Sequence, residues 1–142
     1  MLKNDDLFSF SYFMLHVKID IKSEEINNSN TVIASLLTIE VLFGEEQRRK
    51  MTFDSRKKQK ISIGRIKNEE TDFAFTDNDV SRKQCMIIFE DNNWYIVDGN
   101  GKNPSSNGTW FYPEKYFNIY DGLVIRIGTT LFECQHFEDN DS

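Results

Sequence analysis

Apolar and polar residues alternate along the chain from Phe13 to Lys22. Every second position is apolar as far as Ile21, and the positions between them are polar from His16 onward. Successive side chains of a β-strand point to opposite faces, so this alternation predicts a half-buried strand over residues 13–21. The same pattern returns between Leu37 and Phe43, which predicts a second long strand.

Eight further short apolar runs follow, with turn-forming Asn, Asp and Gly residues between them. They predict strands at about 48–53, 60–64, 72–75, 84–90, 93–98, 109–111, 123–128 and 131–136. No segment shows a long helical periodicity. Many short strands at regular intervals favour an all-β fold, a two-sheet antiparallel β-sandwich whose loops gather at its two ends.

The polar segment SEEINNSNT at 23–31 predicts a linker or long loop. We therefore expect an N-terminal extension over residues 1–31, a sandwich domain over 32–137 and an acidic tail over 138–142. The strand at 13–21 either extends a sheet of its own domain or pairs with a neighbouring chain by strand addition.

The net charge and its distribution along the chain limit the classes of partner that are expected. The chain of 142 residues has a net charge of −6, which opposes general binding of nucleic acid. Residues 48–67 nevertheless hold nine of the 17 Lys and Arg residues and a single acid, Asp54. Such a basic stretch could attract a small anion through its local positive potential, or it could be the solvated face of two strands.

The sequence offers little evidence for a catalytic site or a metal site. Cys85 and Cys134 sit in apolar runs with no partner at metal-ligand spacing, so buried thiols in a reducing compartment are expected rather than a disulfide. With two His residues and no nucleophile-base-acid set, we expect neither an enzyme nor a cofactor. No apolar run approaches a membrane span, and an intracellular protein, nuclear or cytoplasmic, is expected.

Three loop motifs combine residue types that can bind an anion. Gly64-Arg65 closes a predicted strand, SRKQ at 81–84 precedes another, and SSNGTW at 105–110 contains an Asn-Gly pair. Each has an ordinary structural interpretation, because an Arg after a strand is usually solvated, a Ser before a strand often caps a turn, and Asn-Gly is a hairpin signal. The combination of the three motifs is a more specific signal of function than any one of them.

In order, ISIGR at 61–65, VSRKQ at 80–84, NGTW at 107–110 and DGLVIRIGTTLFEC at 121–134 resemble the forkhead-associated (FHA) domain family. The resemblance covers about residues 36–136. It implies an eleven-stranded β-sandwich, and the strand at 13–21 lies outside the matched region as an extra N-terminal strand. It also implies that the end loops bind phosphothreonine in an extended peptide, without cofactor or catalysis.

The resemblance assigns roles to individual residues. Arg65 matches the arginine that contacts the phosphate, Ser81 the serine that hydrogen-bonds it, and Arg82 a frequent second cation. Asn107 matches the asparagine that bonds the peptide backbone, and Ser106 stands where a Thr or Ser often lines the pocket. The loops would be shaped by Gly64, Gln84 and Gly108.

Two departures from the family pattern concern the site. Gln84 replaces a histidine that braces the loop, and GNGKNP at 99–104 lengthens the loop before the serines. Contacts that select the target peptide are expected from Asp79, Lys83 and 99–104. The alternative function is a structural subunit of a larger assembly, which docks through the N-terminal strand independently of phosphorylation.

Overall fold

The computed structural model describes residues 1–44, 47–65 and 70–138. These residues contain eleven strands and no helix, which confirms the predicted all-β class. They form two compact units, Met1–Tyr112 and Pro113–Ser142, the second of which is described as far as residue 138. Residues 45–46, 66–69 and 139–142 lie outside the described residues, and with them most of the acidic tail expected at 138–142.

One sheet of the first unit has five strands in the order β4-β3-β2-β1-β9. All its neighbouring pairs are antiparallel. The strands are β1 (Leu7–Phe10), β2 (Phe13–Ile26), β3 (Ser29–Phe43), β4 (Lys50–Asp54) and β9 (Trp110–Tyr112).

The other sheet of this unit has the order β6-β5-β7-β8. Its strands are β5 (Lys60–Gly64), β6 (Phe73–Ala74), β7 (Cys85–Glu90) and β8 (Asn93–Asp98). The short β6 pairs with β5 in parallel, so the sandwich is antiparallel except at this edge. The predicted ranges of β5, β7 and β8 agree with the structure to within one residue.

Apolar side chains from both sheets form one core. The alternating residues of β2 and β3 face it, and the five-stranded sheet thereby packs against Ile61, Ile63 and Ile87 of the other sheet. Trp94 is fully buried, and its indole N–H donates to the Ser35 hydroxyl at 2.9 Å. That bond satisfies the ring's polar atom, which would otherwise destabilise the core.

The N-terminal strand is an internal part of this sandwich. Pairing with β1 and β3 covers both edges of β2 near its start, and Leu15 and Val17 are fully buried. Residues 13–21 therefore extend a sheet of their own domain, which was the first of the two expected roles. The second expected role, pairing of this strand with a neighbouring chain, is not the one that the structure has. The sequence did not predict β1, because LFSF is only four residues long and ends at a tight turn where Ser11 has a φ of 51°.

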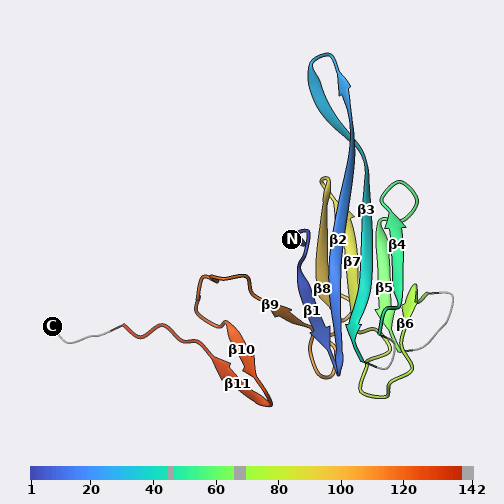
Figure 1. The fold of residues 1–142 in the computed structure, drawn as a ribbon. Coiled ribbons are helices and arrows are strands. Elements are labelled where there is room, and N and C mark those ends of the chain that lie inside the picture. The colour runs from blue at the N-terminus through green and yellow to red at the C-terminus, as the bar shows by residue number, and fades with distance from the viewer. Residues whose placement is uncertain (45–46, 66–69, 139–142) are drawn as a thin grey trace. The chain divides into compact units, whose positions relative to one another are not determined.

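The expected linker at 23–31 is a hairpin end instead. Residues 23–26 continue β2, residues 29–31 begin β3, and Asn27-Asn28 turns the chain with φ angles of 52° and 63°. Asn tolerates left-handed φ, which suits this two-residue turn. The β2–β3 hairpin extends beyond the other strands of its unit (Figure 1), and we call residues 20–33 the arm.

The second unit contains a hairpin of β10 (Val124–Ile127) and β11 (Thr130–Glu133). Gly128 makes its turn with a φ of 60°. Backbone bonds between Gly122 and Cys134 and between Cys134 and Leu123 extend the ladder. Both strands were predicted, with slightly longer ranges. The division into 1–31, 32–137 and 138–142 stays a prediction.

Candidate functional site

Three loops meet at one end of the first unit, and backbone hydrogen bonds join them. The Arg65 N–H, just after β5, donates to the Ser81 carbonyl at 3.0 Å. The Gln84 N–H donates to the Ile63 carbonyl at 2.9 Å, and the Gly99 N–H donates to the Gln84 carbonyl at 2.8 Å. The end of β5, the 75–84 loop and the loop after β8 are therefore held in one arrangement.

Gly64 allows the end of β5 to lie very close to the backbone of the 75–84 loop. A Cβ atom at this position would lie 1.9 Å from the Arg82 carbonyl oxygen, which is backbone and cannot rotate away. Any side chain here would push β5 and the 75–84 loop apart. The prediction that Gly64 shapes the loop thus has a specific steric basis.

Gln84 lies beneath the loops with 1% of its surface exposed. Its side-chain carbonyl accepts from the Ser81 N–H at 3.0 Å, and its amide donates to the Gly108 carbonyl at 3.0 Å and to the Thr109 hydroxyl at 3.1 Å. An amide both donates and accepts, so it can bind two loops at once. These contacts are consistent with the bracing role expected for Gln84.

Asp98 provides a second brace. Its carboxylate accepts from the Ser105 N–H at 3.0 Å, the Ser105 hydroxyl at 2.7 Å and the Thr109 hydroxyl at 2.8 Å. The Ser105 hydroxyl in turn accepts from the Gly108 N–H at 3.0 Å. Asp98 and Thr109 were not predicted as site-forming residues, because partners 7 and 11 positions apart follow no periodic pattern.

Cys85 lies next to this network and is fully buried. Burial, and secondarily the nearby Asp98 carboxylate, raise the pKa of the Cys85 thiol well above its usual range. The thiol therefore stays protonated at neutral pH and is not an activated nucleophile. Cys85 and Cys134 are both free, the first buried and the second half-buried.

The surface above the braces is a cavity of about 520 Å³. All five residues expected to contact a phosphopeptide line it, which are Arg65, Ser81, Arg82, Ser106 and Asn107. The remaining lining residues are Asn78, Asp79, Val80, Lys83, Asn100, Asn103 and Pro104. Of the three expected loop-shaping residues, none lines the cavity.

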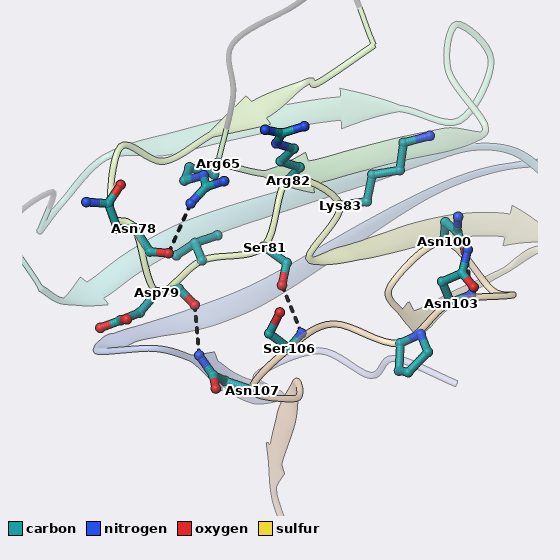
Figure 2. Close-up of a pocket in the computed structure, with 12 residues that line it drawn as sticks. Arg65, Asn78, Asp79, Ser81, Arg82, Lys83, Asn100, Asn103, Ser106 and Asn107 are labelled. Atoms are coloured by element: carbon teal, nitrogen blue, oxygen red, sulfur yellow. Dashed lines mark hydrogen bonds between the residues drawn. The ribbon is translucent and has the colours of Figure 1, made fainter.

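Ser81, Ser106 and Asn107 are fixed at the centre of this cavity. The Ser81 hydroxyl oxygen accepts from the Ser106 N–H at 2.9 Å, and the Asn107 amide donates to the Asp79 carbonyl at 3.1 Å (Figure 2). In this arrangement the Ser81 proton and the Asn107 side-chain oxygen can both bond to a ligand. Gly108 has a φ of 83°, a left-handed conformation that favours glycine and turns the chain after Asn107.

Two guanidinium groups flank the serines. Arg65 donates to the Asn78 carbonyl at 3.1 Å, which points its side chain along the cavity wall (Figure 2). Among the residues that the structure describes, Arg65 has no acidic partner. Arg82 is exposed, and its head group extends away from Ser81 (Figure 2). Arg65 is therefore held by its contact with Asn78, whereas Arg82 would have to rotate to reach a ligand beside Ser81.

The described residues contain no His, Cys, Asp and Glu cluster that could hold a metal ion. No helix suited to crossing a membrane occurs in the same part of the chain. The cavity itself offers hydroxyls, amides and cations, with Asp79 as its one acidic lining residue. Donors of this kind match an anionic ligand.

Comparison with known proteins adds one result. No curated protein and no solved structure matches the chain. A family model described as the FHA domain matches residues 61–128, a range that begins within β5, contains every residue of the candidate site and ends just after β10. The resemblance found in the sequence is thus confirmed over residues 61–128, where the chain is similar to the FHA domain family.

Proposed function

We propose that this chain is a protein-interaction module that binds phosphothreonine peptides in the cavity between its loops. FHA domains are in general phosphothreonine-binding interaction modules and not enzymes. The observation that carries the proposal is that Arg65, Ser81 and Asn107 come from three separate loops and line the same cavity. Each is held there by a hydrogen bond to another loop or to the backbone.

The donor chemistry suits a phosphomonoester. A phosphate on Thr adds a charge of about −1.5 to −2 and three acceptor oxygens. In the proposed complex the Arg65 guanidinium and the Ser81 hydroxyl donate to those oxygens, and Arg82 rotates in from solvent. Hydrogen bonds to charged groups contribute about 1.5–3 kcal/mol each, so two or three of them with backbone contacts reach about micromolar affinity.

Asn107 would have a different task. Its amide nitrogen is occupied by the Asp79 carbonyl, which leaves the side-chain oxygen to accept from a peptide N–H. This contact would orient the peptide rather than detect its charge. We propose that the module acts on intracellular partners, nuclear or cytoplasmic, where reversible phosphorylation of Thr can switch the contact.

The decisive experiment measures binding to a library of phosphothreonine peptides and their unphosphorylated counterparts. Arg65→Ala should abolish binding and leave the thermal midpoint within a few degrees, because Arg65 is at the surface. Lys57→Ala, which removes a cation from the turn after β4, is the matched control and should bind as the original chain does. Equal binding by phosphorylated and unphosphorylated peptides would refute the proposal.

A structural role in a larger assembly is the second candidate, and the arm favours it. Ile21 and Ile26 are 60% and 50% exposed there, on a two-stranded ribbon that no third strand covers beyond Ala34 among the described residues. Such a ribbon offers apolar side chains and open strand edges to a partner. Removing residues 1–30 cannot test this, because it would delete β1 and β2 from the core.

Replacing residues 23–33 by Asn-Gly is the better test. The change joins Lys22 to Ala34, which already pair, and leaves the buried residues in place. If the structural role is correct, partners that co-purify after phosphatase treatment are lost with the arm. If phosphopeptide binding is correct, the shortened chain binds phosphopeptides unchanged.

A further inference from the structure

The cavity extends beyond the phosphate-binding groups. One side is formed by Arg65, Ser81 and Asn107, and the other by Lys83 with Asn100 and Asn103 of the lengthened loop (Figure 2). Because a phosphate group is small, it would fill only the first side. The second side is therefore available to another part of the same ligand.

The lengthened loop is built to keep its shape. The Asn100 side-chain oxygen accepts from the Lys102 N–H at 2.9 Å and from the Asn103 N–H at 2.7 Å. Gly99 turns so tightly, with a φ of 62°, that a Cβ atom would lie 1.8 Å from the Asn103 carbonyl oxygen. A loop held by its own hydrogen bonds loses little conformational entropy when it binds a ligand.

The Lys83 ammonium group and the Asn100 amide nitrogen are donors on this side. The Asn100 oxygen is already used within the loop, and its amide nitrogen has no hydrogen-bond partner in the described part of the chain. The Lys83 ammonium group lies 4.0 Å from Glu70, with side chains 59% and 78% exposed. So long and exposed an ion pair is weak, and an anionic ligand can compete for Lys83.

Charge differs between the two ends of the cavity. Asp79 lies beside Asn78 and Asn107, whereas Lys83 lies toward Asn100 at the other end (Figure 2). A second acidic group of the ligand would be repelled by Asp79 at the first end and attracted by Lys83 at the second. The cavity is thus polarised along its length.

We infer that the ligand carries a second anionic group, which binds to Lys83 and Asn100 while the phosphothreonine binds at Arg65 and Ser81. This inference rests on the proposed function and deepens it. The second group is a carboxylate of Asp or Glu or the phosphate of a second modified residue, on one flank of the phosphothreonine only.

The test uses phosphothreonine peptides in which each flanking position carries in turn Asp, phosphoserine, Ala or Lys. The original chain should favour Asp or phosphoserine over Ala about three- to tenfold at one flanking position, and this preference should not appear on the opposite flank. Comparing Asp with phosphoserine at that position identifies the source of the charge. Lys83→Glu should reverse the preference toward Lys, and Lys83→Met should remove it.

Lys57→Glu is the matched control. It makes the same change of charge in the turn after β4, and its side chain is exposed and does not line the cavity. It should keep the acidic preference. Equal affinities at every flanking position, or an acidic preference that survives Lys83→Glu, would overturn the inference. Either result leaves the proposed function intact as long as Arg65→Ala still abolishes phosphopeptide binding, so the two failures are distinguishable.

Discussion

The hydroxyl oxygen of Ser81 accepts a hydrogen bond from the backbone N–H of Ser106 at 2.9 Å, across a separation of 25 residues. This bond joins the loop before β7 to the loop before β9. It also orients the Ser81 hydroxyl, because an oxygen that accepts here has its proton available for a ligand. Ser81 thus connects the construction of the cavity with its proposed chemistry.

Ser81→Ala should weaken phosphopeptide binding about 10- to 150-fold, which corresponds to the loss of one hydrogen bond to a charged group at about 1.5–3 kcal/mol. Calorimetric titration of one phosphothreonine peptide measures the change. The fold should persist, since Ser106 lies at the surface and water can replace the lost acceptor.

Ser23→Ala is a suitable control, because it removes an exposed hydroxyl from the arm. Its affinity should equal that of the original chain. If Ser81→Ala also binds normally, the Ser81 hydroxyl does not contact the phosphate.

Gln84→Glu should destabilise the fold at neutral pH by about 1–3 kcal/mol. One carboxylate oxygen can still accept from the Ser81 N–H, but the other would face the Gly108 carbonyl oxygen, to which the amide now donates. Urea unfolding of the variant and the original chain at several pH values measures the difference in the free energy of unfolding.

The pH dependence of this difference has a definite sign. Burial and the facing carbonyl raise the pKa of the introduced carboxyl group in the folded variant above its unfolded value of about 4.3. The protonated acid can donate like the amide, so the stability gap should close as the pH falls toward 4.3 and widen as the pH rises. A gap that does not change with pH would show that the Gly108 contact is unimportant.

The local pattern of the chain was sufficient to predict most strands. Alternation in β2 and the apolar runs of β5, β7 and β8 each lie within one element, so a period of two residues marks them. Residues 23–31 of the arm were interpreted as a linker because they are polar except for Ile26. No core covers that part of the hairpin, so no apolar face was selected there.

The sequence pointed to five residues that line the cavity and to two of its supports, Gly64 and Gln84, but not to the support from Asp98. Arg65, Ser81 and Asn107 belong to motifs that resemble a known family, and the structure brings them to one cavity. The Asp98 brace joins the end of β8 to Ser105 and Thr109 in the segment before β9, and its geometry exists only after the chain has folded. The direction of the Arg82 side chain likewise depends on the tertiary structure.

Gly64→Ala should destabilise the fold by more than about 2 kcal/mol and weaken phosphopeptide binding as well. The new methyl group would overlap the Arg82 carbonyl oxygen, so either β5 or the 75–84 loop must shift. Gly101→Ala is the matched control. It lies in a loop with a φ of 83° but meets only side chains at 3.8 Å, so its expected cost is about 1 kcal/mol of backbone strain.

Chemical unfolding and peptide titration of both variants separate the two effects. The prediction fails if Gly64→Ala costs no more than Gly101→Ala. It also fails in its second half if Gly64→Ala is destabilised but binds the peptide normally once folded.

Phosphopeptide affinity should fall several-fold between about pH 7.5 and about pH 5. The second pKa of the phosphate is about 6, and the Arg65 guanidinium would lower it further in the complex, so the dianion is the form that binds best. Binding then releases protons near pH 6 and weakens as the pH falls through about that value. The described residues that line the cavity include no histidine, so the ligand dominates the dependence. A version of the same peptide in which a fluorinated phosphonate replaces the phosphate has a lower second pKa. Its affinity should therefore decline at a lower pH. An affinity that is constant over this range, with the tryptophan fluorescence of the folded chain unchanged, would mean that the cavity does not distinguish the dianion from the monoanion.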